Sequence, residues 1–195
     1  MNQIAVIIVS WNTKALLFDC LSSLLSDIDA EHMRTSVRVI VVDGASSDGS
    51  VEMLQREFPQ VELQALGENV GYVKANNLAL RSLGYDDDAP LAGAGRMPNY
   101  VWLLNPDTRV LAGCMRTLLD FMRAHPRCGL CGPQLLNGDG SLQHGAFAFP
   151  GLMQLAIDTQ PKLARFRNTR LDGRYDPSQY AAGLPFEIGF PLGAG

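Results

Sequence analysis

Asn105 and Asp107 stand one residue apart, directly after the apolar run 101–104. Pro106 lies between them and forbids helix continuation, so the run is expected to be a buried strand that ends at these two side chains. In open α/β sheets, ligands bind at the carboxyl ends of the strands. A carboxylate fixed there suits a divalent cation that is shared with a phosphate group. The alternative is a turn in which Asp107 only caps the following helix, and these residues alone do not decide between the two.

The first apolar run of the chain, 4–9, also ends in polar residues. Its β-branched composition predicts a buried strand, which is followed by Ser-Trp-Asn-Thr at 10–13. Asn12 or Thr13 can cap a helix, because apolar residues recur at helical spacing over 17–25. The pattern therefore predicts a strand, a tight polar loop and a helix.

Asp43 closes the second apolar run, 37–42, and begins a loop of small residues. Ser47 or Asp48 can cap the next helix, which Pro59 stops. A carboxylate at a strand end beside small residues is typical of a nucleotide pocket. The alternative is that Asp43 satisfies the hydrogen bonds of its own loop. Neither of these two strands is followed by the glycine-rich dinucleotide fingerprint or by a Walker loop.

Asn76 and Asn77 lie early in a helix that is predicted to follow a third strand at 61–66. Asn is a poor helix former, so two amides at the start of a helix that begins at the ligand edge suggest polar contacts there. The competing interpretation is that one amide only fixes the loop before the helix, and both interpretations stay open.

The composition places limits on partners and location. The 195 residues, 47% hydrophobic and 18% charged, are ordinary for one folded domain with a substantial core. The net charge of −4 gives no electrostatic case for nucleic acid or for an anionic membrane surface. Arg165, Arg167 and Arg170 form a small basic run near Lys162, interpreted first as a solvated face and second as a contact for an acceptor or a headgroup. Four scattered cysteines, no signal-peptide pattern and no apolar stretch of about 18 residues favour a cytoplasmic location.

Several features of the later part of the chain are given structural rather than functional interpretations. The acidic run 86–88 lies in a loop rich in glycine and proline, and it is interpreted as solvated rather than as a metal site. Cys128 and Cys131 are interpreted as buried structural thiols on a short strand, rather than as a zinc or redox site. A hairpin turn is predicted at 137–140 and a further strand at 186–190.

Strands and helices alternate up to residue 107, which predicts an α/β fold with a mainly parallel sheet flanked by helices. Four stretches, in their order and spacing, resemble the family 2 inverting glycosyltransferases of the Rossmann-like GT-A fold. They are VIIVSWN at 6–12, VIVVDGASSDGS at 39–50, NVGYVKANN at 69–77 and WLLNPDT at 102–108. The Asn-Pro-Asp-Thr form is most similar to bacterial rhamnosyltransferases of cell-wall and O-antigen assembly. The segment 132–143 is similar to the hairpin segment of the family.

The resemblance implies a binding site for a nucleotide-diphosphate sugar, dTDP- or UDP-linked. In the family pattern, Ser10 and Asp43 line the nucleoside pocket, and Asp43 meets the base. Asn105 and Asp107 take the place of the family's D-x-D pair, and Asp107 would coordinate Mg²⁺ or Mn²⁺ on the diphosphate. Asn105 replaces the first aspartate, which lowers the charge of the site and is expected to weaken metal binding. The other residues expected to contact the nucleotide sugar are Asn12, Gly71, Asn76 and Asn77.

The implied reaction is transfer of a sugar, with inversion, to a glycan or lipid-linked acceptor in cell-envelope polysaccharide synthesis. Rhamnose is the sugar that the Asn-Pro-Asp-Thr form favours, and the implied location is cytoplasmic and peripheral at the inner membrane face. Two positions depart from the family pattern: Gly44 stands where the family usually has Asn, and Ala75 where it commonly has Gly. Both residues are small, so the pocket shape is expected to survive, but an amide contact is lost at Gly44.

The resemblance covers nearly the whole chain, which is therefore expected to be a single GT-A domain over 1–195. Within it, 1–110 would be the part that binds the nucleotide-sugar donor, and 111–195 the start of an incomplete acceptor-side part. In the family, the carboxylate that acts as catalytic base comes after the stretch at 193–195. No residue of this chain is assigned as the base.

Glu187 and Asp158 are carboxylates of the later part, but neither has a motif around it. The alternative function is a truncated module that binds nucleotide and metal without catalytic activity of its own. A dinucleotide-dependent oxidoreductase would need the glycine fingerprint, which is absent. An incomplete half would leave the apolar flank at 186–190 open, which predicts self-association.

Overall fold

The computed structural model describes residues 4–85, 97–149, 151–166, 171 and 173–191. The chain divides into two compact units, one that extends to Ala124 and one that begins at His125. The acidic run 86–88 and the stretch 193–195, both singled out in the sequence, lie outside the described residues.

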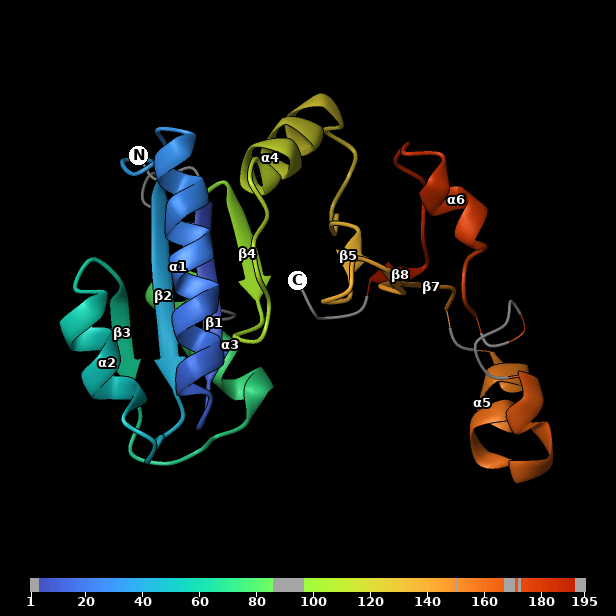
Figure 1. The fold of residues 1–195 in the computed structure, drawn as a ribbon, viewed down its shortest axis with the longest axis horizontal. Helices are drawn as coiled ribbons and strands as arrows, with labels where there is room; N and C mark the ends of the chain where they lie inside the picture. The colour runs from blue at the N-terminus through green and yellow to red at the C-terminus, as the bar shows by residue number, and fades with distance from the viewer. Residues whose placement is uncertain (1–3, 86–96, 150, 167–170, 172, 192–195) are drawn as a thin grey trace. The chain divides into compact units, whose positions relative to one another are not determined.

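The first unit alternates strands and helices, as the sequence predicts. Its elements are β1 Ile4–Ser10, α1 Lys14–Ala30, β2 Val37–Asp43, α2 Ser50–Glu57, β3 Glu62–Ala65, α3 Tyr72–Ser82, β4 Tyr100–Leu104 and α4 Cys114–Ala124 (Figure 1). The four strands form one parallel sheet in the order β3-β2-β1-β4. The prediction of a parallel sheet with a helix after each strand is confirmed.

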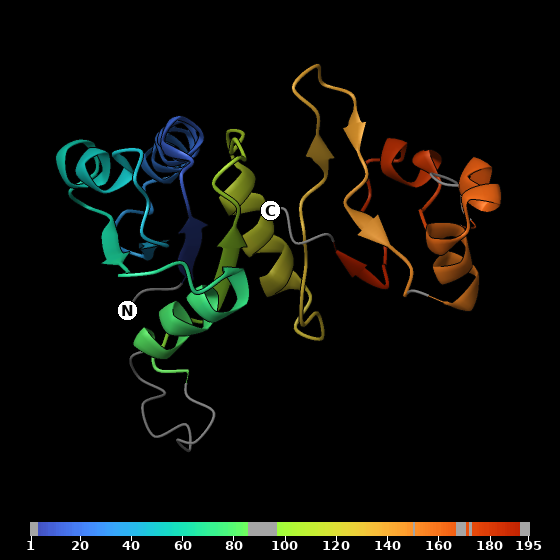
Figure 2. The same ribbon diagram turned by 90° about the horizontal axis from the view of Figure 1, so that it is seen from below.

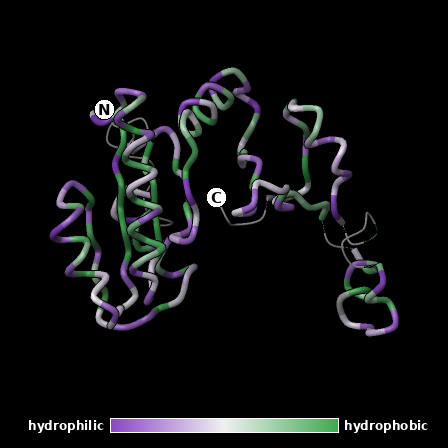
Figure 3. The backbone as a smooth tube through the Cα atoms, viewed as in Figure 1, coloured by the Kyte–Doolittle hydropathy of each residue, from purple (hydrophilic) through white to green (hydrophobic). Residues whose placement is uncertain are grey.

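Helices cover both faces of this sheet. Even-numbered residues of β1, such as Val6 and Ile8, pack with α1, α2 and α4, whereas Ala5 and Ile7 pack with α3. Figure 2 shows α1 and α2 on one face of the sheet and α3 on the other. Since β1 is buried on both faces, its sequence is apolar without the alternation of a half-exposed strand. In Figure 3 the central strands of the sheet are accordingly coloured mostly as hydrophobic, whereas β3 at its edge also carries hydrophilic residues.

The order of the strands reverses between β1 and β4. The chain adds β2 and then β3 on one side of β1, and it returns through α3 to place β4 on the other side. In doubly wound sheets, a crevice for ligands opens at such a reversal, outside the carboxyl ends of the strands. The fold therefore brings the end of β1 and the end of β4 to the place where a ligand is expected.

The second unit is built from short elements. They are β5 Leu135–Leu136, β6 Leu142–Gln143, β7 Ala146–Phe147, α5 Leu152–Thr159, the 3₁₀ helix η1 Pro161–Phe166, α6 Pro177–Ala181 and β8 Phe190–Pro191. The predicted hairpin is confirmed: β5 and β6 pair antiparallel, and the Asn137 N–H donates to the Ser141 carbonyl at 2.8 Å. β7 pairs antiparallel with β8.

Two strand predictions in this unit are wrong. The segment from Cys128 to Cys131 forms no strand, and both thiols are half-buried rather than buried. Its apolar run is very short, because Gly129 and Gly132 leave only Leu130 and Cys131 between them, so little is left to pair. The strand expected at 186–190 is reduced to β8, because β7 offers only two partner residues and the Gly189 N–H instead donates to the Tyr175 hydroxyl at 2.9 Å.

None of the helices in the described ranges is both long and apolar enough to span a lipid bilayer.

Candidate functional site

Ser10 and Asp43 are the last paired residues of β1 and β2, and both are buried. The Asp43 carboxylate accepts hydrogen bonds from the Ser46 N–H at 2.8 Å and from the Ser46 hydroxyl at 2.6 Å. The Ser10 hydroxyl lies 2.9 Å from the Thr13 hydroxyl. Asp43 therefore does satisfy its own loop, as one of the two sequence interpretations expected. Its contact with a base stays a prediction.

The loops that follow β1 and β2 are bonded to each other through Asn12 and Ser46. The Asn12 N–H donates to the Ser46 hydroxyl at 2.9 Å, and the Ser47 N–H donates to the Asn12 Oδ1 at 2.8 Å. Ser46 thus passes a hydrogen-bond chain from Asp43 to Asn12. Asn12 and Ala45 both adopt left-handed backbone angles, with φ of 54° and 61°. Such angles are strained for a residue with a side chain, and the cross-linked loops hold them.

Asp48 holds the start of two helices at once. One carboxylate oxygen accepts the N–H of Lys14, the first residue of α1, at 2.8 Å. The other accepts the N–H and the hydroxyl of Ser50, the first residue of α2, at 3.0 and 2.6 Å. Desolvation acts to raise the pKa of Asp48, but the hydrogen bonds from Ser50 and Lys14 outweigh it and hold the pKa below its usual value. The predicted capping of α1 by Asn12 or Thr13 is wrong, because the Thr13 side chain makes no cap hydrogen bond.

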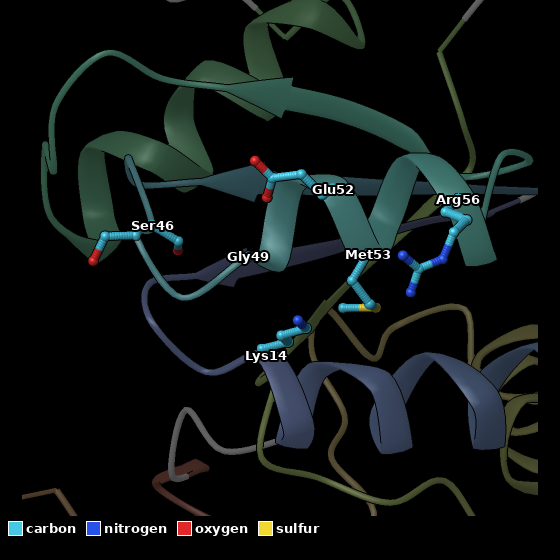
Figure 4. Close-up of a pocket in the computed structure, with 7 residues that line it drawn as sticks. Lys14, Ser46, Gly49, Glu52, Met53 and Arg56 are labelled. Atoms are coloured by element: carbon cyan, nitrogen blue, oxygen red, sulfur yellow. The ribbon is translucent and has the colours of Figure 1, made fainter.

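A cavity of about 270 Å³ opens beside these loops, between the start of α1 and α2 (Figure 4). It is lined by Lys14, Ser46, Ser47, Gly49, Glu52, Met53 and Arg56. None of the residues that the sequence singled out as site residues lines it. The cavity therefore borders the β1 and β2 loops but is not the crevice between β1 and β4.

Asn105 and Asp107 follow β4 at the neighbouring strand end. The register between β1 and β4 ends with Ile8 opposite Leu104, so Ser10 and Pro106 each lie two residues beyond the last pair. The Asn105 carbonyl accepts the Thr108 hydroxyl at 2.7 Å and the Cys20 thiol of α1 at 3.5 Å. The Asp107 side chain is exposed. The carboxylate is therefore available to a ligand at the carboxyl edge of the sheet, where the sequence predicts it.

The charge of Asp107 affects the pKa of the Cys20 thiol on α1. Burial raises the pKa of Cys20 to about 11; the hydrogen bond with Thr108 opposes this rise, and the negative charge of Asp107 adds to it. The helical spacing of apolar residues predicts Cys20 only as a core position. No sequence signal distinguishes a core thiol that also holds a loop from one that only packs.

Asn69 and Gly71 form the turn that begins α3. The Asn69 Oδ1 accepts the Gly71 N–H at 2.9 Å, and Gly71 has a φ of 80°, which only glycine adopts readily. A Cβ built on Gly44 would lie 3.5 Å from the Asn69 side chain and from the Ser10 carbonyl. The larger Asn of the family pattern at position 44 would therefore compete with Asn69 for this space.

Asn76 and Asn77 differ sharply in their surroundings. Asn76 is 5% exposed, and its amide nitrogen donates to the Tyr72 carbonyl at 3.0 Å. Its Oδ1 has no hydrogen-bond partner among the described residues, although buried acceptors are almost always satisfied. Asn77 is exposed. The buried oxygen of Asn76 is thus an unsatisfied acceptor in the second turn of a helix that starts at the ligand edge.

The structure therefore brings Ser10, Asn12 and Asp43 together through one hydrogen-bonded pair of loops, and it places Asn105 and Asp107 at the adjacent strand end. Ser46 is the residue of this arrangement that sequence reasoning missed. Its only sequence signal is its position in the loop of small residues after Asp43. In the part of the chain that the structure describes, no group of three or more His, Cys, Asp or Glu side chains forms a closed metal site.

Comparison with known proteins agrees with the motifs. The N-acetylglucosaminyl-diphospho-decaprenol L-rhamnosyltransferases of Mycobacterium tuberculosis strains CDC 1551 and H37Rv are 29% identical to this chain over 155 residues. The match covers 75% of this chain and 50% of theirs, so the chain spans about half the length of these curated relatives.

Solved structures share the fold of this chain. S. aureus TarS 1–349 superposes with a TM-score of 0.51 at 18% identity, covering 76% of this chain and 42% of that one. The same fragment in complex with UDP-GlcNAc superposes with a TM-score of 0.50 at 20% identity, covering 69% of this chain and 37% of that one. The expected GT-A fold, a mainly parallel sheet flanked by helices, is confirmed. The model of the family described as glycosyl transferase family 2 matches residues 5–177, a range that contains the four ordered motifs. The chain therefore belongs to glycosyl transferase family 2.

Proposed function

We propose that this chain binds a nucleotide-diphosphate sugar at the carboxyl ends of β1, β2 and β4. The observation that carries the proposal is the exposed Asp107 carboxylate at the strand-order reversal, beside the bonded loops of Asn12 and Ser46. The nucleoside would lie against the loops after Ser10 and Asp43. The diphosphate and sugar would extend towards Asn105, Asp107 and the start of α3, where Gly71, Asn76 and Asn77 lie.

The oxygen-bearing side chains at this site suit the binding of Mg²⁺ or Mn²⁺. Asp107 is one exposed carboxylate with the Asn105 amide two residues away, rather than a closed cage of side chains. A cation of this kind binds through one or two carboxylates and completes its shell with water and substrate phosphates. Asp107 would hold the cation and Asn105 would assist. When bound, the metal neutralises the charge that develops on the leaving diphosphate.

The reaction that we propose is transfer of the sugar, with inversion, to a lipid-linked or glycan acceptor. The printed name of the mycobacterial relatives is that of an L-rhamnosyltransferase acting on N-acetylglucosaminyl-diphospho-decaprenol. It supports rhamnose as the sugar and a lipid-linked acceptor, and we further propose a dTDP- or UDP-linked donor and a role in building the cell envelope. We also propose that the protein is cytoplasmic and works at the inner face of the membrane.

A second candidate is a module that binds donor and metal without transferring the sugar by itself. Inversion needs a base that takes the proton of the attacking hydroxyl, and no described carboxylate has a contact that assigns it this role. The donor-binding part, proposed at 1–110, would then bind nucleotide in either case.

Calorimetry separates these possibilities. The chain would be titrated with dTDP and with UDP, each in the presence of Mn²⁺ or of EDTA. We expect binding that requires the metal and that weakens at least about 100-fold in Asp107→Ala, since even groups behind a metal ligand contribute about 10- to 100-fold. Asp120→Ala, which removes an exposed carboxylate on α4, is the matched control and should bind as the unchanged chain does.

Asp107→Ala binding as tightly as the unchanged chain would overturn the metal assignment. Transfer or hydrolysis of a donor sugar by the isolated chain would instead overturn the second candidate.

A further inference from the structure

Cys128 and Cys131 lie three residues apart in a loop of the second unit, and the proposed donor site uses neither of them. Both residues are half-buried, whereas Cys20 is sealed in the core of the first unit. Their loop belongs to no helix or strand. A structural role on a buried strand, the interpretation favoured from the sequence, therefore does not account for this pair of thiols.

The shape of the loop brings the two cysteines together. The chain bends at Gly129, and the Cys128 thiol donates a hydrogen bond of 3.2 Å to the Leu130 carbonyl. The peptide bond that follows is trans, and in a trans peptide the carbonyl oxygen lies about 2.8 Å from the next Cα. The Cys128 sulfur is therefore within about 6 Å of the Cys131 Cα. A disulfide between the two needs rotation of the side chains and a small movement of the loop, but no unfolding.

Two further observations agree with this geometry. Burial raises the pKa of the Cys131 thiol, and negative charge on the nearby Cys128 raises it further. A Cβ built on Gly129 would meet no atom within 4 Å, and Leu130 is 70% exposed. The two residues between the cysteines therefore have open space in which the loop can adjust.

A zinc ion does not account for the pair. A structural zinc site takes four ligands, so two cysteines would need two more side chains beside them. Among the residues that the structure describes, no group of three or more His, Cys, Asp or Glu side chains could hold a metal ion. The ligand set of a zinc site is therefore incomplete around this loop.

We propose that Cys128 and Cys131 form a reversible redox site, which a small disulfide such as glutathione disulfide closes into a disulfide within the chain. The Cys128 thiolate attacks one sulfur of glutathione disulfide, forms a mixed disulfide and releases one glutathione thiolate. The Cys131 thiolate then attacks the Cys128 sulfur and releases the second glutathione. Two protein thiols are oxidised to one disulfide, one glutathione disulfide is reduced to two glutathione molecules, and these take up the two thiol protons.

The order of the two steps follows from burial, because the desolvated Cys131 thiol ionises less readily and is suited to react second. In a reducing compartment, disulfides of this kind are transient and act as redox sensors rather than as permanent cross-links. Closure would stiffen the chain shortly after α4, where the second unit begins. The site goes beyond the proposed donor binding and does not depend on it.

Tryptic digestion and mass spectrometry of the whole chain test the site. Trypsin cleaves after Arg127, and the next basic residue is Lys162, so both cysteines fall in the peptide 128–162. Cys20 and Cys114 fall in two other peptides. The chain is incubated with glutathione disulfide, and the remaining thiols are alkylated. We expect the peptide 128–162 to lose two hydrogens and to carry no alkyl group, and dithiothreitol should reverse this change.

At about 0.1 mM reduced glutathione, the closed disulfide should exceed the mixed disulfide at least about tenfold, because neighbouring thiols have effective concentrations of millimolar or more. Cys128→Ala and Cys131→Ala should each abolish closure and keep a mixed disulfide on the cysteine that remains. Cys114→Ala removes a half-buried thiol outside the loop, so this matched control should close as the unchanged chain does. Circular dichroism checks the folding of each variant, and either variant of the pair suffices if the other does not fold.

The proposal is overturned if the peptide 128–162 keeps both thiols, or if it carries only mixed disulfides. Cross-links from this peptide to the peptides of Cys20 or Cys114 would also overturn it, as would failure of Cys114→Ala to close. Donor binding is measured separately by calorimetry on the reduced chain, so a negative result here leaves the proposed nucleotide site untouched.

Discussion

The carboxylate of Asp27 accepts a hydrogen bond of 3.0 Å from the backbone N–H of Met115, 88 residues further along the chain. Its other oxygen accepts the N–H of Gly113 at 2.5 Å. Asp27 lies near the end of α1 and is 3% exposed, so the first backbone groups of α4 satisfy a buried charge, and the helix dipole favours it. Because α4 follows the loop of Asp107, this contact fixes the far end of that loop to α1.

Asp27→Ala should therefore destabilise the first unit. The half-buried N–H of Gly113 and the buried N–H of Met115 lose their acceptor, which is expected to cost about 2–3 kcal/mol of the free energy of unfolding. Asp19→Ala removes an exposed carboxylate from the same helix and should cost less than about 0.5 kcal/mol. Urea unfolding followed by circular dichroism measures both. Equal losses in the two variants would contradict a capping role for Asp27.

Asp48→Asn should lower stability near neutral pH but not in acid. Asp48 has its pKa lowered in the folded chain from an ordinary value of 3.8, so the stability that it contributes is present above that value and is lost as the pH falls through the folded pKa. Asp48 is exposed, so water screens the effect, and about 0.5–1 kcal/mol is expected at about pH 7. The urea midpoints of Asp48→Asn and of the unchanged chain should converge as the pH falls towards about 3. A difference that stays constant over this range would contradict the assignment.

Asn76→Leu should separate stability from ligand binding. Leucine has the branched shape of asparagine but a larger volume, and it removes an unsatisfied buried oxygen, so the free energy of unfolding should fall by no more than about 1–3 kcal/mol. If the oxygen is satisfied by the donor, metal-dependent binding of the nucleotide sugar should weaken at least about tenfold. Asn77→Leu, at an exposed neighbour, is the comparison. Loss of binding only in Asn77→Leu would show that the exposed amide makes the contact.

Strands and helices of the first unit could be predicted because their signals are local. The apolar run of β1 is buried on both faces, and Pro59 and Pro106 end the elements before them. The capping of α1 could not be predicted, because its acceptor is Asp48, on a different loop. Asn12 and Thr13 satisfy the local rule for a cap, but a tertiary contact replaces it.

The residues of the candidate site also divide into those that the sequence predicts and those that it does not. Asp43 and Asp107 follow apolar runs that predict strands, and the parallel sheet brings the ends of those strands to one edge. The role of Ser46 and the unsatisfied oxygen of Asn76 depend on side-chain partners that spacing does not encode. Cys128 shows the converse, because a short apolar run satisfied the local pattern of a strand without a partner to pair with.

The left-handed residues Asn12 and Ala45 lie in loops that bond to each other, so neither loop keeps its shape alone. Any transfer of these loops to a related protein must therefore move both as a matched pair. A graft of the second loop by itself would leave the first without the serine hydroxyl that receives its amide proton.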